Sequence, residues 1–342
     1  WRALWKFRGN DYYWRRLSWG WADSMNVKHL LKEFYRIEQR PELIWGVGAG
    51  YLEGGVAAQQ IARALNLPWL FELHDPPRRA GLGPDNRIVK TRFSELLHDA
   101  VRVIVTADSY KSSIVRQYQL KHEKVCTIHL SYDGKSITAN EKMKEHCFTL
   151  AYAGSLSGGR TMKPLLLAIT AAFEKQPKMR QMFKLELAGA GAGFDEINQL
   201  SPALGLTKNI EYHGLIPGNM VAALLERAVA VIVIENSSKL QVPGKIFEIL
   251  KVGKAILGLM PQDCEAAKIL IQAGLGFIHK ANDIKDITET LIRMWQAWRE
   301  DKVITKPNES FIQGFSAEQL PIKLADALRD YVHIQNFESE IN

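Results

Sequence analysis

The sequence predicts an α/β protein with two domains, each built around a parallel β-sheet. Short β-branched runs alternate with longer stretches of helical periodicity along the whole chain, and this alternation is typical of βαβ units. The chain has 342 residues, 46% of them hydrophobic, which is enough for two hydrophobic cores and would overfill a single one. A polar stretch at residues 131–146 has little apolar patterning and separates the two halves.

Four strands are predicted in the first half of the chain, at Leu43–Val47, Trp69–Leu73, Val101–Thr106 and Val125–His129. Helical periodicity lies between these strands, around Gly55–Leu65, Lys90–Asp99 and Tyr110–Tyr118. We therefore expect a first domain at residues 1–135 and a linker at residues 136–147.

Six strands are predicted in the second half, at Thr149–Ala153, Lys184–Ala188, Ile210–His213, Val229–Ile234, Ala255–Leu259 and Gly276–Ile278, with a helix in each gap. Near the end, Ser316-Ala317-Glu318-Gln319 has the pattern of a capping box. The helix that it predicts has apolar residues along one side, at Leu320, Leu324, Leu328 and Tyr331. These signals give a second domain at residues 148–315 and a C-terminal helix at 316–342 that crosses back to the first domain.

The composition argues against several classes of protein. Three cysteines, Cys126, Cys147 and Cys264, lie far apart without metal-ligand spacing, so the sequence predicts neither a disulfide framework nor a metal site. No run of 18 or more apolar residues occurs, and the chain opens with Trp1-Arg2-Ala3 rather than a secretory leader. We expect a cytoplasmic protein that does not span a membrane.

The positive charge gathers in the first half. The net charge is +7, and residues 1–147 hold 23 Lys and Arg against 16 Asp and Glu, whereas the rest of the chain is neutral. Residues 1–21 contain five tryptophans and five basic residues against one acid, Asp11. This mixture suits the anionic inner face of a membrane, to which the protein would bind peripherally. Equally, the aromatic rings could face the core and the basic residues be merely solvated. A neutral second half and the lack of a known module argue against nucleic-acid binding.

One candidate anion site lies at Pro243-Gly244-Lys245, which predicts the start of a helix whose buried side is formed by Ile246, Ile249 and Leu250. Free N–H groups at a helix N-terminus attract a diphosphate, and Lys245 adds a full charge. Glu248 lies three residues on, where its carboxylate could accept hydrogen bonds from ribose hydroxyls. On the physics alone, Lys245 and Glu248 could also be an ordinary surface pair.

Another candidate is the glycine-rich loop that follows Tyr152-Ala153-Gly154-Ser155 and ends at Arg160. Glycines let the backbone approach a phosphate, and an arginine can clamp it with two hydrogen bonds. The alternative is a plain tight turn between strand and helix. A later glycine run, residues 189–193, has Phe194 where a dinucleotide fingerprint needs its third glycine, so NAD binding is not predicted.

Taken in order, these motifs resemble a known family. The stretch from Phe148 to Gly276 is similar to the donor lobe of the family 4 retaining glycosyltransferases, which have the GT-B fold with two Rossmann-like lobes that face a cleft. The resemblance rests on Tyr152-Ala153-Gly154-Ser155-Leu156, Leu187-Ala188-Gly189, Tyr212-His213-Gly214 and the stretch from Pro243 to Lys254. The first half resembles the family less closely, over Pro41 to Gly134. Family members begin with a strand and a glycine-rich loop that precede the region matching Trp1, so the resemblance implies an incomplete N-terminal lobe.

The resemblance also implies roles for individual residues. Glu248 would hold the ribose, Arg160 and Lys245 would face the diphosphate, and the loop at Gly214, Leu215 and Ile216 would border the base. Gly154, Ser155, Gly189 and Gly244 complete the implied donor site. Many members carry a further glutamate eight residues before the ribose one, and that position here is Leu240.

In the first domain, His74 and Asp75 follow a strand that such enzymes point towards the acceptor. Either residue could bind the acceptor hydroxyl or help to take its proton. A turn cap is the other interpretation of a His-Asp pair at a strand end.

The expected activity is transfer of a sugar from a UDP- or GDP-sugar to a hydroxyl of a glycan or lipid-linked acceptor, with retention of configuration and without a metal or cofactor. The family builds cell-surface polysaccharide. Two alternatives stay open: a nucleotide-sugar epimerase with the same two lobes, and a non-catalytic protein that binds nucleotide or glycan.

Overall fold

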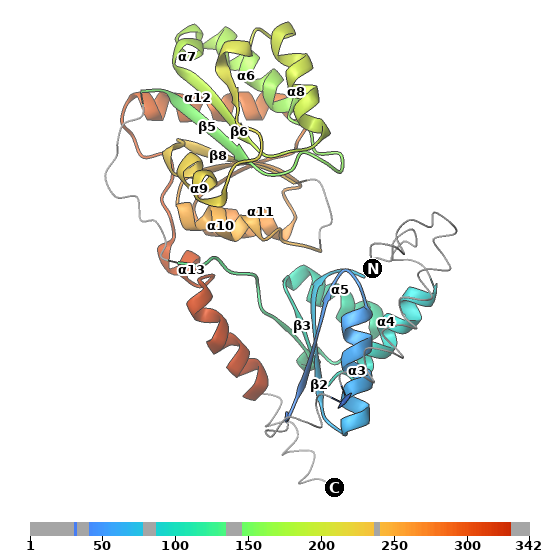
Figure 1. Ribbon diagram of the computed structural model, residues 1–342. Helices are drawn as coiled ribbons and strands as arrows, with labels where there is room; N and C mark the ends of the chain where they lie inside the picture. Colours follow the sequence, from blue (N-terminus) through green and yellow to red (C-terminus); the bar gives the residue numbers. More distant parts are fainter. Residues whose placement is uncertain (1–30, 33–40, 78–86, 135–145, 236–239, 330–342) are drawn as a thin grey trace, which may run out of the picture. The chain divides into compact units, whose positions relative to one another are not determined.

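The computed structural model describes residues 31–32, 41–77, 87–134, 146–235 and 240–329. The chain divides into two compact units, one formed by residues up to His129 together with those from Pro321 onward, and the other by Leu130–Leu320 (Figure 1). Each unit has its own parallel sheet. The basic aromatic segment, Tyr331 and the predicted linker apart from residues 146 and 147 lie outside the described residues.

The first unit contains a four-stranded sheet in the order β1-β2-β3-β4, with every pair parallel. Its strands are β1 (Ile44–Ala49), β2 (Trp69–Asp75), β3 (Arg102–Val105) and β4 (Val125–Thr127). Its helices are α3 (Glu53–Leu65), α4 (Arg87–Asp99) and α5 (Asp108–Tyr118), and the short helix η3 spans His122–Lys124. All four predicted strands and all three predicted helices are confirmed.

Glycine brings α3 close to β1. A Cβ atom on Gly54 would lie 2.1 Å from the backbone oxygen of Val47, and one on Gly46 would lie 2.6 Å from Cβ of Ala58. Only hydrogen fits at such contacts. The helix α3 therefore packs directly against the backbone of β1.

The second unit contains a six-stranded parallel sheet in the order β10-β9-β8-β5-β6-β7. The strands are β5 (Phe148–Ala153), β6 (Phe183–Ala188), β7 (Ile210–Tyr212), β8 (Ala230–Ile234), β9 (Ala255–Leu259) and β10 (Gly276–His279). All six predicted strands are confirmed. This order, 3-2-1-4-5-6 along the chain, is that of a Rossmann sheet.

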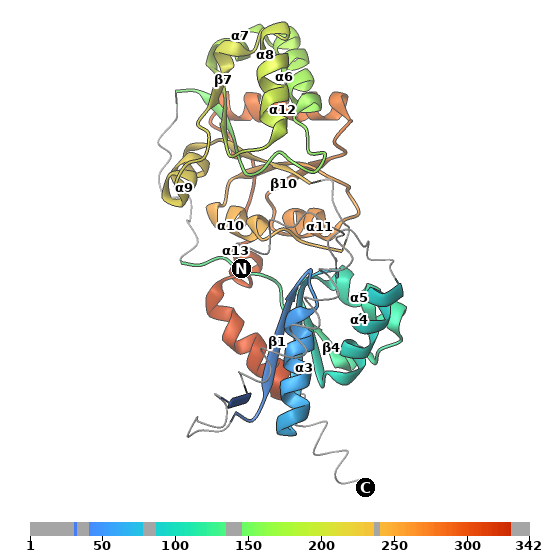
Figure 2. The same cartoon turned by 45° about the vertical axis from the view of Figure 1, so that its right-hand side comes forward.

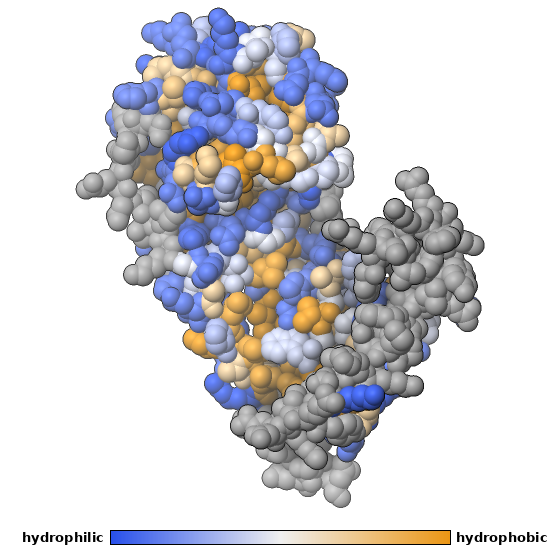
Figure 3. Space-filling view, in the orientation of Figure 1, coloured by the Kyte–Doolittle hydropathy of each residue, from blue (hydrophilic) through white to orange (hydrophobic). Residues whose placement is uncertain are grey.

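Helices cover both faces of this sheet (Figures 1 and 2). One face carries α6 (Lys163–Lys175), α7 (Pro177–Met182), α8 (Ala192–Ala203) and α12 (Ile284–Arg299), and the other carries α9 (Gly218–Arg227), α10 (Lys245–Val252) and α11 (Glu265–Gln272). Figure 3 shows that the outer surface of the upper helices is largely hydrophilic, as expected of helices that bury one side. The core includes Phe148, whose ring centroid lies 5.8 Å from that of the buried Trp295. No helix in these parts of the chain is both long and apolar enough to cross a membrane.

The second unit ends with α13 (Glu309–Gln313) and the short helix η5 (Ala317–Gln319), and residues 320–329 are helical. The predicted capping box at Ser316 is wrong. Ser316 instead forms a parallel bridge with Tyr132, whose N–H donates to Phe315 O and whose carbonyl accepts from Ala317 N. The bridge draws Ser316 into a buried position, where its hydroxyl caps no helix N–H. Of the predicted apolar side, Leu320, Leu324 and Leu328 are only half-buried.

Candidate functional site

The second sheet reverses its direction of growth at β5. From β5 the chain adds β6 and β7 on one side, and then β8, β9 and β10 on the other. At such a switch point the loops that leave β5 and β8 diverge, and ligands of open α/β sheets bind in the crevice beyond the carboxyl ends of these strands. The loop after β5 carries Gly154, Ser155 and Arg160, and the connection after β8 leads to Gly244 and Lys245. The topology therefore brings both predicted anion-binding motifs to one place.

Backbone hydrogen bonds join the loops after β5, β6 and β7. The N–H of Gly154 donates to Ala188 O at 2.9 Å, and the N–H of Gly189 donates to Gly214 O at 2.8 Å. The hydroxyl of Tyr212 also donates to Gly189 O, at 2.8 Å. Three of the predicted glycines thus lie in consecutive, connected loops at one edge of the sheet.

The glycine run at residues 189–193 allows the loop after β6 to lie close to the loop after β5. Gly189 has φ +140°, and a Cβ atom there would lie 1.9 Å from Gly154 O. Gly191 has φ +126°, and its Cβ would lie 2.6 Å from Leu156 O. Both positions demand glycine because of their backbone conformation and because of the neighbouring loop. The run is therefore a packing device between two loops.

The charged centre of the site consists of Arg160, Glu235 and Lys245. Nη2 of Arg160 lies 3.0 Å from Oε2 of Glu235 and 3.3 Å from Oε1. Glu235 follows β8 directly and is only 4% exposed. Nζ of Lys245 lies 5.7 Å from the ring centroid of Tyr152, and a Cβ atom on Gly154 would lie 3.7 Å from it. Lys245 thus lies at the start of the glycine-rich loop, and Arg160, at its end, pairs with Glu235.

Burial shapes the acid–base behaviour of this centre. Burial lowers the pKa of Lys245, the nearby Arg160 lowers it further, and Glu235 acts in the opposite direction. Burial also raises the pKa of Tyr152 to about 12. The tyrosine hydroxyl is therefore protonated at neutral pH, and it donates to the carbonyl of Ser155 at 3.0 Å. This hydrogen bond holds the loop at the point where it leaves β5.

The helix α10 begins as predicted. Gly244 is its N-cap residue, Lys245 is its first residue, and Ile246, Ile249 and Leu250 are buried. Glu248 lies one turn further on and is exposed, so its carboxylate is accessible to a ligand. Lys245 places a full positive charge beside Gly154, and the N-terminus of α10 carries partial positive charge.

The loop after β7 is open. Gly214 has φ +65°, Leu215 is 81% exposed and Ile216 is half-buried. His213 precedes this loop, and its Nε2 lies 3.3 Å from Oε2 of Glu186 on β6, which also accepts a hydrogen bond from Arg227 of α9. The buried Glu186 therefore ties both ends of the 213–227 segment to the sheet. Ser155 is exposed and shares a hydrogen bond with Ser157 at 2.7 Å.

Glu235 is the residue that the sequence analysis missed. It is the first residue after an apolar strand, at the carboxyl end where ligand-binding groups of α/β proteins gather. Its position at the carboxyl end of a strand is the sequence signal by which Glu235 could have been found. Its partner Arg160 lies 75 residues earlier, so the pair itself cannot be inferred from local pattern.

His74 and Asp75 belong to the first unit and end β2, which runs two residues beyond its predicted end. Nε2 of His74 lies 2.6 Å from Oε1 of Glu72. The hydrogen bond to Glu72 raises the pKa of His74, with a smaller contribution from Asp75, although burial acts against it. The raised pKa favours the protonated ring, which donates hydrogen bonds and takes up no proton.

Glu72→Gln is expected to lower the pKa of His74, because it removes the carboxylate that stabilises the protonated ring while burial persists. The measurement is an NMR titration of the His74 ring in wild type and variant. Glu95→Gln, on the exposed side of α4, serves as a control that removes one carboxylate elsewhere in the same unit. An unchanged titration of His74 in the Glu72 variant would contradict the assignment.

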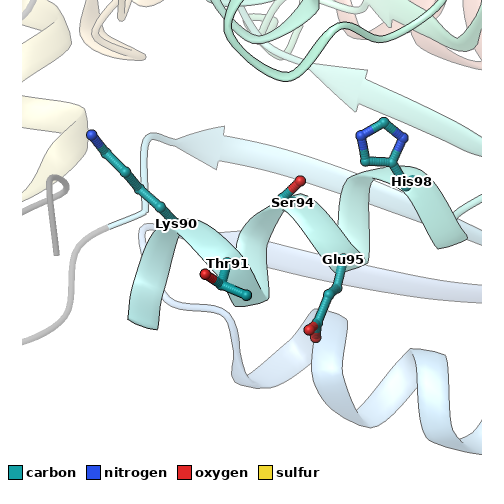
Figure 4. Close-up of a pocket in the computed structure, with 5 residues that line it drawn as sticks. All are labelled: Lys90, Thr91, Ser94, Glu95 and His98. Atoms are coloured by element: carbon teal, nitrogen blue, oxygen red, sulfur yellow. The ribbon is translucent and has the colours of Figure 1, made fainter. Parts of the chain in front are cut away.

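A hollow on the first unit lies along α4 and is lined by Lys90, Thr91, Ser94, Glu95 and His98. Figure 4 shows that Ser94 and His98 point to one side of the helix, whereas Thr91 and Glu95 point to the other. These side chains do not converge on a common point. The hollow is a solvated helix face, and we assign no function to it.

No model of a known protein family matches the chain, and neither does any curated protein sequence. Solved structures do resemble it. Sucrose-phosphate synthase from Thermosynechococcus elongatus has a TM-score of 0.62 at 15% identity, over 90% of this chain and 77% of that one. The chain has the GT-B fold. Two further GT-B structures agree with it over similar lengths.

The lipopolysaccharide outer core galactosyltransferase WaaB has a TM-score of 0.61 at 12% identity, over 88% of this chain and 78% of that one. The UDP-forming α,α-trehalose-phosphate synthase from Burkholderia xenovorans has a TM-score of 0.62 at 14% identity, over 93% and 77%. At these identities the likeness establishes the GT-B fold, and the chemistry must be argued from the residues themselves.

Proposed function

We propose that the protein is a glycosyltransferase that takes its sugar from a nucleoside diphosphate sugar bound to the second unit. The observation that carries this proposal is the position of Lys245 beside Gly154, with Arg160 near enough to act on Lys245, at the switch point of a Rossmann sheet and at the start of α10. Two side-chain cations and a helix N-terminus form a seat for a diphosphate. The solved structures with this fold include sugar-transferring enzymes, which supports the same reading.

In this proposal the seat acts on the leaving group. As the bond between the sugar and the diphosphate breaks, negative charge grows on the diphosphate oxygens. Arg160, Lys245 and the N–H groups at Gly244 stabilise that charge from fixed positions, which is the largest contribution that such a site makes to catalysis. The proposal assigns this task to the protein's own groups, without a cofactor or metal.

The remaining donor contacts follow from the resemblance to family 4. Glu248 is exposed on α10 and would hold the ribose, while Gly214, Leu215 and Ile216 would border the base. The base is uracil or guanine; one neighbouring structure is described as UDP-forming. The same resemblance supports retention of configuration, with acceptor attack on the face that the diphosphate leaves.

The acceptor is proposed to be a hydroxyl of a glycan or of a lipid-linked sugar, in the cytoplasm or at the inner membrane face, in the assembly of cell-surface polysaccharide. His74 and Asp75 of the first unit are the candidate acceptor contacts. With its pKa raised by Glu72, His74 acts in this proposal as a hydrogen-bond donor that orients the acceptor.

A screen of UDP- and GDP-sugars tests the donor proposal. The correct donor at about 100 times its Kd stabilises the fold by about 2.7 kcal/mol, which for a domain of this size raises the melting temperature by roughly 5–10 °C. Free UDP and GDP separate the contribution of the nucleotide from that of the sugar. If no nucleotide or nucleotide sugar changes the melting temperature, the proposed donor site is refuted.

Product analysis then separates the proposed activity from its alternatives. A glycosyltransferase releases free nucleoside diphosphate and lengthens an acceptor. A nucleotide-sugar epimerase returns an altered donor with the diphosphate bond intact, and a non-catalytic binding protein leaves the donor unchanged.

A further inference from the structure

Glu235 is fixed by its backbone at the carboxyl end of the sheet. Its N–H donates to Leu259 O at 3.0 Å, which extends the pairing of β8 with β9 by one residue. Its side chain is almost completely buried. A carboxylate in such a place has little freedom to move, and it is costly to bury unless cations surround it.

Arg160, by contrast, is held by a loop with a permissive backbone. Gly158 and Gly159, directly before it, have φ +63° and +80°. One nitrogen of its guanidinium, Nη2, contacts both oxygens of Glu235. Nε of Arg160 is buried and meets no acceptor among the described residues. One nitrogen of the guanidinium is therefore engaged by a fixed anchor, so the position of Glu235 determines where the guanidinium lies.

Glu235 compensates part of the charge of the two cations before any ligand arrives. The charged groups that act on Lys245 are Arg160, from the loop after β5, and Glu235, after β8. The ammonium group of Lys245 lies over the ring of the neutral Tyr152. Without Glu235, two half-buried cations would act on each other and lose the carboxylate near them, and the protonated form of Lys245 would be less favourable. Glu235 thus favours the protonated form of Lys245 and fixes the position of Arg160.

We propose that Glu235 is a positioning residue of the diphosphate seat: it holds Arg160 in place and adds negative charge near Lys245, so that the seat offers two cations to an incoming diphosphate. This inference rests on the proposed donor site. Glu235 itself makes no contact with the diphosphate in this arrangement.

The test is calorimetric titration of Glu235→Gln with UDP, GDP and inorganic pyrophosphate between pH 6.5 and 9.5. We expect roughly tenfold weaker binding near neutral pH, because Arg160 loses a charge-assisted anchor. We also expect the alkaline loss of binding to begin at a lower pH than in the wild type, because the pKa of Lys245 falls further. Titration of the ligand is the same for both proteins and cancels in the comparison.

Glu235→Asp separates charge from geometry and serves if the glutamine variant does not fold. Aspartate keeps the negative charge but is one methylene shorter. We therefore expect weaker ligand binding than in the wild type, with the same dependence of affinity on pH. Glu174→Gln is the control. It also removes one negative charge, but from the exposed side of α6 and outside the group formed by Arg160, Glu235 and Lys245, so it should leave binding unchanged.

Binding in Glu235→Gln that equals or exceeds the wild-type affinity with a superimposable pH profile would overturn the inference, and so would wild-type affinity in Glu235→Asp. Either result would leave the proposed donor site intact, provided that the wild-type protein binds the nucleotides. If the wild-type protein binds neither nucleotide nor pyrophosphate, the proposed function fails together with the inference.

Discussion

Lys245→Ala is expected to lower the rate of sugar transfer by about 10²–10³-fold while the protein remains folded. Lys245 opens α10 beside Gly154, where it can meet charge that grows on the leaving diphosphate. The loss should therefore appear in kcat as well as in kcat/KM. Initial rates with the donor identified in the nucleotide-sugar screen measure both.

Stability should respond differently from turnover. The pKa of Lys245 is lowered chiefly by burial, so the folded chain binds this proton less tightly than the unfolded chain does. At neutral pH its charge therefore opposes folding, and its removal should leave the melting temperature near that of the wild type. Lys208→Ala, at an exposed position of the same unit, is the matched control and should retain full activity. Wild-type turnover in Lys245→Ala would exclude the proposed role.

The sequence predicted strands such as β8 and β9 well because each is a short apolar run that a buried parallel sheet requires. The strand β9 begins and ends as predicted, at Ala255–Leu259. The start of α10 was equally accessible, since Pro243 and Gly244 mark a helix start and Ile246, Ile249 and Leu250 give its buried side. These signals are local and lie within one or two turns of the chain.

The features that escaped prediction depend on residues far apart in sequence. Ser316 does not cap a helix because it pairs with Tyr132, and no pattern around residue 316 reveals that partner. Glu235 belongs to the site because the fold brings it to Arg160. The glycine run at residues 189–193 has a local pattern, but its reason is the loop that starts at Gly154. Predicting such contacts requires the strand order, which periodicity alone does not give.

The dependence of the site on these joined loops leads to a second large effect. Gly189→Ala is expected to destabilise the second unit by at least about 3 kcal/mol, because it combines backbone strain with steric overlap. The added methyl group would lie 1.9 Å from Gly154 O, at a residue whose φ of +140° already disfavours alanine. For a domain of this size, such a loss lowers the melting temperature by roughly 6–12 °C.

Gly158→Ala provides the comparison that isolates the overlap. Gly158 also has a positive φ, of +63°, but a Cβ atom there would meet nothing within 4 Å. The substitution should therefore cost only about 1–2 kcal/mol of backbone strain. Because Gly189 lies against the loop that carries Gly154 and leads to Arg160, its alanine variant should also weaken UDP or GDP binding in the fraction that remains folded. Equal melting temperatures for the two variants would show that the loops can separate without cost, and the diphosphate seat would then not depend on their contact.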